Sequence, residues 1–124
     1  MATIKKMKEG SPHSKGECIS ALLPVRDALQ VLSGNWKLLI LISLTGEAKR
    51  FKQISKDVTG ITDKMLSKEL KDLEANKLIV RTVYDSFPPT VEYAITDHGL
   101  SIWTVIAALK EWGMLHRKKV MGKG

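Results

Sequence analysis

The sequence predicts a mainly α-helical α+β protein, and three observations support this prediction. The chain has 124 residues, of which 44% are hydrophobic and 27% charged, so it fits one domain with a modest core. Apolar residues recur at helical spacing over most of the chain after residue 22. Only two short segments, 78–84 and 91–95, have the β-branched composition of strands.

The N-terminal part of the chain divides into an arm and a first helix. Residues 1–17 are polar, carry three lysines between positions 5 and 8, and are expected to form a flexible basic arm. Residues 18–124 are then the folded domain. Its first helix is expected near residues 22–32, because Pro24 suits a first helical turn and the apolar positions that follow recur every three or four residues.

Three further helices lead up to the strands. Segment 36–45 is apolar on most sides, so we expect it to be the central buried helix. Segment 50–58 reads as a short helix, and a turn at Thr59-Gly60 separates it from a longer helix at 62–75. Asn76 is well placed to end that helix in a left-handed conformation.

The C-terminal part completes the pattern. The two β-branched segments flank a loop with Pro88-Pro89, which cannot pair regularly, so they are expected to form a hairpin. Thr96 and Asp97 are expected to cap one long final helix that runs to about residue 119. A short helix, a turn, a longer helix and a hairpin make a winged helix-turn-helix, here with N-terminal and long C-terminal dimerisation helices.

The positive charge of the chain predicts a nucleic-acid partner. Lys and Arg number 20 against 13 Asp and Glu, which gives a net charge of +7 and a pI near 9.6. Residues 49–81 alone carry nine cationic and five acidic side chains. A basic surface binds nucleic acid because phosphate neutralisation releases counterions. The alternative is a basic protein whose lysines are only solvated.

The strongest signal lies on the helix at 62–75. At about 100° per residue, three leucines share an arc of about 60° and three lysines share the opposite arc. The leucines are Leu66, Leu70 and Leu73, and the lysines are Lys64, Lys68 and Lys71. A helix packed through its leucines would present the lysines and Ser67 to a major groove. Three acidic residues beside them (Glu69, Asp72 and Glu74) leave open an ordinary solvated helix face.

Other classes of protein have little support in the sequence. No apolar run approaches the roughly 20 residues of a membrane span, and the N-terminal stretch lacks the apolar core of a signal peptide, so a cytoplasmic protein is expected. One cysteine cannot form an internal disulfide. His13, His98 and His116 lie far apart without ligand spacing, so neither a metal nor another cofactor is expected. The chain has no recognisable nucleophile–base constellation, so an enzyme is not expected.

The motifs taken together resemble a known family. In the first half they are Asn35-Trp36-Lys37-Leu38-Leu39-Ile40, Arg50-Phe51 with Ile54, Gly60-Ile61, Lys64-Met65-Leu66-Ser67 and Leu70-Lys71-Asp72-Leu73-Glu74. In the second half they are Leu78-Ile79, Arg81, Tyr84, Pro88-Pro89, Val91-Glu92-Tyr93 and Thr96-Asp97-His98-Gly99. In this order, from Cys18 to about Gly113, they are similar to the HxlR family of bacterial winged-helix regulators, relatives of the MarR type.

The resemblance implies a homodimeric transcription regulator that binds double-stranded DNA, with 62–75 as its recognition helix. The residues expected at the DNA are Arg50, Ser55, Thr62, Lys64, Ser67, Lys68, Lys71 and Arg81. The chain departs from the family after the paired prolines, where the hairpin often carries a cation but this chain has Thr90, with Asp85 before the prolines. This departure weakens the expectation of a cation in the minor groove. Arg81 and the terminal lysines are the candidates to replace it.

The composition of the last helix predicts a second copy of the chain. Apolar residues cover more than half of its circumference, so one domain cannot bury them all. The residues expected at the dimer interface are Leu22, Leu29, Ile102, Trp103, Ile106, Leu109 and Trp112. The alternative is a last helix that the N-terminal segment of the same chain covers.

The tryptophans and the single cysteine are the candidates for an effector site. Trp36, Trp103 and Trp112 are expected in the core or the dimer interface, and the alternative is that they line a small-molecule pocket. In the family that the chain resembles, some members sense oxidants with a cysteine at the place of Cys18. Lys15 and the start of the following helix favour its thiolate, whereas Glu17 opposes it. The alternative is a structural cysteine.

We therefore expect a sequence-specific DNA-binding transcription regulator, a repressor, that acts as a symmetric homodimer and performs no chemistry. The alternative from another class is a winged helix that binds a protein without specific DNA binding. RNA is less favoured, because the expected strands offer no aromatic platform on an exposed face.

Overall fold

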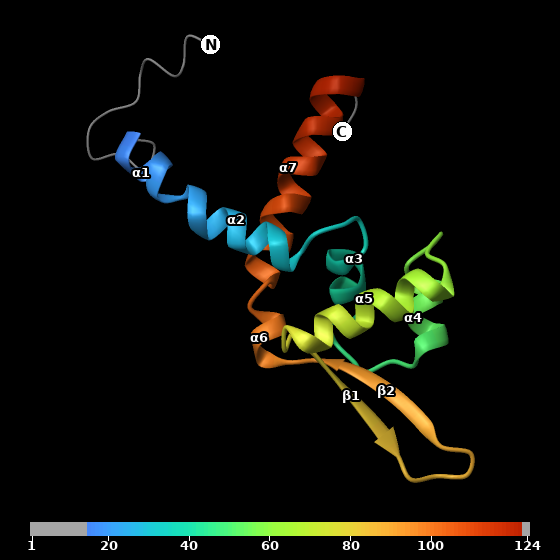
Figure 1. Cartoon of the computed structure of the whole chain (residues 1–124). Coiled ribbons are helices and arrows are strands. Elements are labelled where there is room, and N and C mark those ends of the chain that lie inside the picture. Colours follow the sequence, from blue (N-terminus) through green and yellow to red (C-terminus); the bar gives the residue numbers. More distant parts are fainter. Residues whose placement is uncertain (1–14, 123–124) are drawn as a thin grey trace. The chain divides into compact units, whose positions relative to one another are not determined.

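The computed structural model describes residues 15–122, and these divide into two units at Ser33–Gly34. The first unit contains α1 (Lys15–Ser20) and α2 (Leu22–Val31) (Figure 1). Helix α1 occupies the end of the segment that was expected to be a flexible arm. Glu17 in its first turn favours a helix start, because a carboxylate near the N-terminus complements the helix dipole. Residues 1–14 of the expected arm lie outside the described residues.

Helix α2 forms where apolar periodicity predicts a helix, yet its apolar residues are not covered. Four of them remain more than half exposed, and they are Leu22, Leu23, Val25 and Leu29. A helix with an uncovered apolar stripe gains little from folding by itself. It therefore needs a further surface to pack against.

The second unit contains the winged helix-turn-helix. Its elements are α3 (Lys37–Leu44), α4 (Phe51–Asp57), α5 (Asp63–Ala75), β1 (Ile79–Tyr84), β2 (Thr90–Ile95), α6 (Asp97–Leu100) and α7 (Trp103–Met121). The fully buried side chains at its centre come from α3, α4, α5 and β1, and they are Ile40, Leu41, Leu44, Ile54, Leu66, Leu70, Leu73 and Ile79. Helix α3 is central as predicted, but Leu39 and Ile42 on its other side are exposed.

The two ends of α5 differ in how well the sequence predicts them. At its start, the Thr62 hydroxyl oxygen accepts the N–H of Met65 at 3.1 Å and caps the helix. At its end, the prediction of a left-handed Asn76 is wrong: the φ of Asn76 is −89°, and Lys77 has the positive φ of 62°. The reversal comes one residue later because the N–H of Leu78 turns back to the Leu73 carbonyl, 3.0 Å away.

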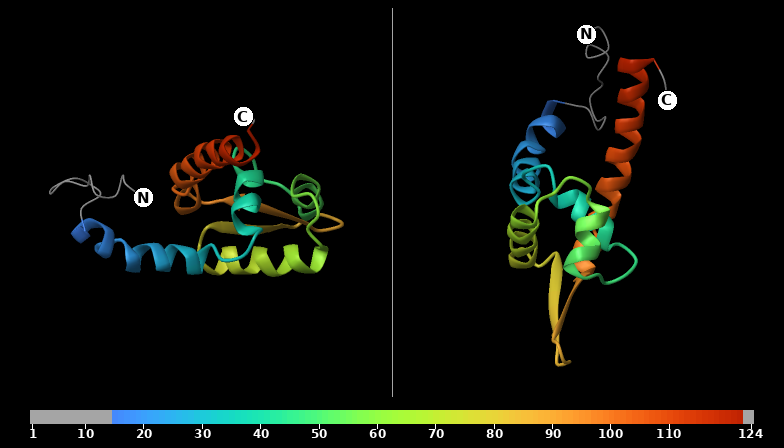
Figure 2. Two further views of the ribbon diagram at one scale, coloured as in Figure 1. Left: turned by 90° about the horizontal axis from the view of Figure 1, so that it is seen from above. Right: turned by 90° about the vertical axis from the view of Figure 1, so that its right-hand side faces the viewer.

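The predicted hairpin forms within one residue of its expected bounds. Strands β1 and β2 pair antiparallel from Ile79 opposite Ile95 to Tyr84 opposite Thr90. The hairpin projects beyond α4 and α5, as Figures 1 and 2 show. Lys49 adds one further pairing, with backbone hydrogen bonds of 2.8 and 2.9 Å to Tyr93. A single paired residue leaves no periodic pattern, so the sequence could not predict it.

The final helix is interrupted, whereas one continuous helix was predicted. Thr96 caps α6 as expected, its hydroxyl oxygen accepting the N–H of Gly99 at 2.9 Å. The N–H of Ile102 then bonds to Gly99 at 3.1 Å instead of to the residue four back, so the helical ladder breaks before α7. No helix within residues 15–122 is long and apolar enough to cross a membrane.

Candidate nucleic-acid interface

Helix α5 has the two faces that its sequence predicts. Leu66, Leu70 and Leu73 are buried against the core. On the other face the three lysines are exposed and Ser67 is half-buried. Lys64, Ser67, Lys68 and Lys71 thus lie together on one side of the helix, which we call the lysine face. Three ammonium groups and a hydroxyl on one exposed helix face can bond phosphate oxygens and the acceptors of base edges.

Three other expected contact residues lie on α4, at its start and at the turn that leads into α5. Arg50 is exposed at the start of α4, where its N–H donates to Oε1 of Gln53 at 2.8 Å. Ser55 is half-buried on α4. Thr62 uses its hydroxyl oxygen to cap α5, and its hydroxyl proton can still donate to a partner. Arg50 and Thr62 therefore lie at helix starts that local hydrogen bonds hold in place.

The hairpin carries the eighth expected contact. We call β1, β2 and the loop between them the wing. Arg81 is exposed on β1 and pairs in register with Tyr93. Between residues 82 and 90 the only charged side chain is Asp85. The cation of the wing therefore lies toward its base, and its tip carries an acidic residue.

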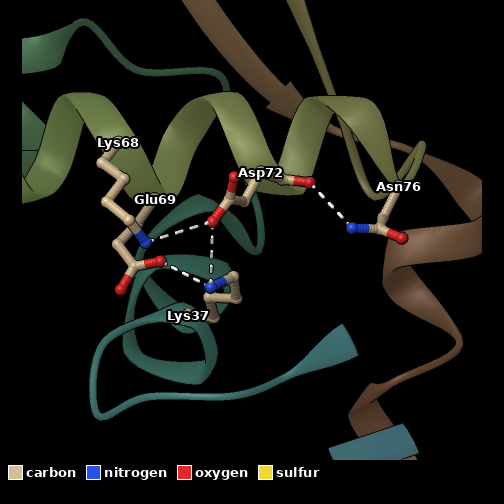
Figure 3. A network of polar contacts seen from close by, with 5 residues as sticks. All are labelled: Lys37, Lys68, Glu69, Asp72 and Asn76. Carbon is tan, nitrogen blue, oxygen red and sulfur yellow. Dashed lines mark hydrogen bonds and ion pairs between the residues drawn. The ribbon is translucent and has the colours of Figure 1, made fainter. Parts of the chain in front are cut away.

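A buried ion pair joins α5 to α3, and sequence reasoning did not find it. Lys37 Nζ lies 2.6 Å from Glu69 Oε1, and each side chain is only 5% exposed. Figure 3 shows the wider network: Asp72 Oδ2 lies 3.4 Å from the ammonium of Lys37 and 3.4 Å from that of Lys68. Glu69 is thus part of the core rather than an acidic flank of the lysine face. The sequence signal for this pair was Glu69, which lies on the same side of the helix as the three leucines, and Lys37, which lies beside an apolar run.

This network shifts the pKa values of Lys37 and Asp72 and keeps both groups charged. Burial alone lowers the pKa of Lys37, but the carboxylates of Glu69 and Asp72 outweigh it and raise the pKa above its ordinary value. Partial burial raises the pKa of Asp72, but Lys37 and Lys68 outweigh it and lower the pKa. Both groups therefore stay charged at neutral pH. The lysines neutralise two carboxylates that would otherwise repel phosphate from this helix.

A second polar cluster fixes the end of α4. The Ser43 hydroxyl donates to Asp57 Oδ2 at 2.7 Å, and Lys49 Nζ lies 2.5 Å from the same oxygen. The hydrogen bonds from Lys49 and Ser43 lower the pKa of Asp57. Ser43 of α3 and Lys49, which pairs with Tyr93 of β2, thus both bind the carboxylate of Asp57 at the end of α4. The cluster therefore holds the first helix of the helix-turn-helix in place.

Among the residues expected at a dimer interface, Ile106 differs from the rest in its burial. It is only 7% exposed in the single chain, so little of its surface is left for a second copy to cover. Trp103 and Leu109 are about half exposed, Trp112 is 60% exposed, and Ile102 is half-buried. On α2, the expected Leu22 and Leu29 are exposed.

The tryptophans differ in burial and in what lies beside them. Trp36 is half-buried. The ring of Trp112 stacks on His116, with centroids 4.9 Å apart. The open concavity beside Trp112 is lined by residues of α7 alone, which include Glu111, Met114 and Leu115. A concavity on one helix is a surface feature, and it gives a small ligand no enclosing walls.

The remaining candidate residues lie outside the lysine face. Cys18 is exposed on α1 in the first unit. Within residues 15–122, no three His, Cys, Asp or Glu side chains come together in an arrangement that could hold a metal ion.

Comparisons with known proteins agree with one another. The sequence model of the HxlR-like helix-turn-helix family matches residues 31–121. The HTH-type transcriptional regulator YtcD of Bacillus subtilis is 38% identical over 100 residues, which cover 81% of this chain and 79% of YtcD. An HTH-type transcriptional regulator of Methanothermobacter thermautotrophicus is 39% identical over 95 residues, which cover 77% of this chain and 72% of the relative.

A solved structure shares the fold over most of both chains. The redox regulator HypR in its reduced form has a TM-score of 0.74 and 33% sequence identity, over 80% of this chain and 98% of HypR. In its oxidised form the TM-score is 0.69, with 36% identity over 73% of this chain and 93% of that chain.

Proposed function

Since the chain belongs to the HxlR-like helix-turn-helix family, we propose that it is a DNA-binding transcription regulator that reads duplex DNA with α5. The observation that carries the proposal is the face of Lys64, Ser67, Lys68 and Lys71, held outward by three buried leucines on the opposite side. A helix with a cationic, hydrogen-bonding face fits a major groove. Arg50 and the wing then lie beside the groove.

Binding in this proposal is positioning and readout, with no chemical step. Lysine ammonium groups reach phosphates and base acceptors, and hydroxyl groups such as that of Ser67 bond either kind of partner. The protein acts as a repressor by occupying its operator and excluding other proteins from it. Such a regulator works where the chromosome is, which in bacteria and archaea is the cytoplasm.

The regulator acts as a homodimer. Support comes from the uncovered apolar residues of α7, where Trp103, Leu109, Trp112 and Leu115 are all about half exposed or more. Exposed apolar surface on this scale is typical of a face that packs against another chain. Two copies related by a two-fold axis place two α5 helices on successive major grooves, so the operator is a two-fold repeat.

The experiment that tests the proposal is a selection of bound duplexes followed by a salt titration. Duplexes bound by the full chain are selected from a random pool, and the dissociation constant of the best is measured from 50 to 300 mM salt. We expect the logarithm of the affinity to fall linearly with the logarithm of the salt concentration. A chain that selects no duplex, and whose weak binding ignores sequence, is instead a protein-interaction module.

A redox effector is a second candidate feature. It is supported by the exposed Cys18 and by HypR, a redox regulator solved in reduced and oxidised forms. A peroxide would oxidise the Cys18 thiolate to a sulfenic acid, with the peroxide reduced to water or an alcohol. Condensation with Cys18 of the partner subunit would release water and leave an intersubunit disulfide. The disulfide would change the spacing of the two recognition helices.

Operator affinity with and without peroxide tests this candidate. Wild type should change affinity on oxidation and recover with a thiol reductant, whereas Cys18→Ser should not respond. Equal affinities for both proteins under both conditions would make Cys18 a structural residue.

A further inference from the structure

The tip of the wing presents one fully exposed aromatic ring. Phe87 has a relative exposure of 102%, and no other exposed large hydrophobic residue of the described chain exceeds 68%. Asp85 and Ser86 precede it and Pro88 follows it, while the nearest exposed large apolar side chains, Val83 and Tyr84, are only about half exposed. The ring therefore extends from the tip further than any neighbouring apolar side chain.

The loop is built to hold that ring outward. The N–H of Ser86 donates to the Tyr84 carbonyl at 2.9 Å, and the Ser86 hydroxyl donates to the Pro88 carbonyl at 2.8 Å. The same hydroxyl lies 3.5 Å from the hydroxyl of Thr90 on the opposite strand. Two consecutive prolines restrict the backbone further. The backbone that carries the ring therefore has little conformational freedom left to lose on binding.

The base of the wing is fixed to the end of α5. The Leu78 N–H donates to the Leu73 carbonyl at 3.0 Å, and the Thr96 N–H donates to the Leu78 carbonyl at 3.0 Å, so the base of the wing, where β1 begins and β2 ends, is joined to the end of α5. A strand of six residues such as β1 spans about 20 Å. The minor groove that flanks a major groove is half a helical turn away, or about 17 Å. The tip can therefore reach it.

We propose that Phe87 is an apolar wedge that enters the minor groove beside the recognition-helix site and partly unstacks one base step. The inference rests on the proposed DNA binding. With Asp85 as the only charge between residues 82 and 90, the tip has no cation to draw it into the groove, so insertion of the ring supplies the contact. Pyrimidine–purine steps (TA, CA/TG) unstack most easily. Phe87 therefore selects such a step at a fixed distance from the bases that α5 reads.

Fluorescence of 2-aminopurine tests the wedge. The duplex selected by the full chain is prepared with 2-aminopurine at each adenine of its flanking minor grooves. We expect wild type to raise the fluorescence at one position of each flank, because unstacking removes quenching. Phe87→Ser should abolish that rise and weaken binding by about tenfold, as loss of one base–aromatic contact does. Phe87→Leu should keep most of both effects.

Three further measurements separate the wedge from other roles of the residue. The salt slope of Phe87→Ser should equal that of wild type, because an apolar contact releases no counterions. Val80→Ser removes an exposed apolar side chain at the base of the same wing and should leave both readings unchanged. Asp85→Asn should bind about twofold to threefold more tightly, because it removes a negative charge next to phosphate.

The failure of the wedge can be told from the failure of the proposed function. A wild-type chain that binds the selected duplex with a steep salt slope, but raises no 2-aminopurine signal, overturns the wedge and leaves DNA binding intact. Wild-type affinities for both Phe87→Ser and Asp85→Asn would also overturn the wedge and leave DNA binding intact. The exposed ring would then be a contact for a protein instead. A chain that selects no duplex overturns both.

Discussion

Lys37 and Glu69 join α3 to α5 through a pair of charges 2.6 Å apart that solvent hardly reaches. Glu69 lies on the buried side of α5, so the pair fixes how that helix is rotated about its axis relative to α3. The lysine face depends on this rotation, because a turn of one residue would carry Lys68 about 100° away from its place. By fixing the rotation of α5, this buried pair determines that the candidate DNA-contacting residues face outward.

Breaking this pair should be costly, and replacing both partners should not. We expect Lys37→Met to lower the free energy of unfolding by about 3–5 kcal/mol, because it leaves the Glu69 carboxylate buried without its partner. The double variant Lys37→Met/Glu69→Leu should recover most of the loss. Urea unfolding measures both, and the exposed Lys56→Met serves as the control, with an expected change within about 0.5 kcal/mol. A single variant as stable as wild type would show that the pair contributes nothing.

Acid should destabilise the protein through two aspartates. The folded state holds the pKa values of Asp57 and Asp72 below their ordinary value of 3.8. The unfolded chain therefore takes up protons first as the pH falls, and the free energy of unfolding should decrease from about pH 5 downward. Urea unfolding between pH 6 and pH 3 measures this. The pH dependence should be shallower in Asp57→Asn/Asp72→Asn, and an identical slope would contradict the assignment.

Gly99 should not tolerate a side chain. A Cβ atom built there would lie 2.2 Å from the Leu78 carbonyl oxygen, which is backbone and cannot move aside cheaply. We expect Gly99→Ala to lower the free energy of unfolding by about 1–3 kcal/mol. Gly16 has nothing within 4 Å of its Cβ position, so Gly16→Ala on α1 is the control and should not destabilise. Equal thermal unfolding of the two variants would contradict the close contact at Gly99.

The exposed apolar side of α7 should hold two copies together. Sedimentation at micromolar concentration should show a dimer for wild type. Leu109→Glu should give a folded monomer, because it places a charge in an apolar interface. Lys110→Glu puts the same charge on the neighbouring position of the helix and should remain dimeric. Ile106→Glu should instead unfold the chain, because Ile106 is buried in the single copy. A wild-type monomer would refute the dimer.

Helical and strand periodicity were enough to predict most of the fold and the exposed face of α5. They work where a regular element buries one side, as Leu66, Leu70 and Leu73 do. They fail for features that depend on partners distant in sequence. Glu69 looks like a surface residue until Lys37, 32 positions earlier, is brought beside it.

The break before α7 was missed for a related reason. It consists of a single hydrogen bond from the Ile102 N–H to the Gly99 carbonyl three residues back, which apolar periodicity within the last helix cannot show. Burial of Ile106 within one copy was missed because its helix is apolar on several sides, so no single face stands out from the sequence.

The most direct measurement compares operator binding by wild type and by Lys64→Ala/Ser67→Ala/Lys68→Ala as a function of salt. The triple variant should fold, lose most of its preference for the operator, and have a salt slope smaller by about 2, one for each lysine removed from phosphate. Lys110→Ala/Arg117→Ala removes two cations from α7 and should keep the wild-type slope. A folded triple variant that binds the operator with wild-type affinity and slope would contradict the assignment of α5 as the recognition helix.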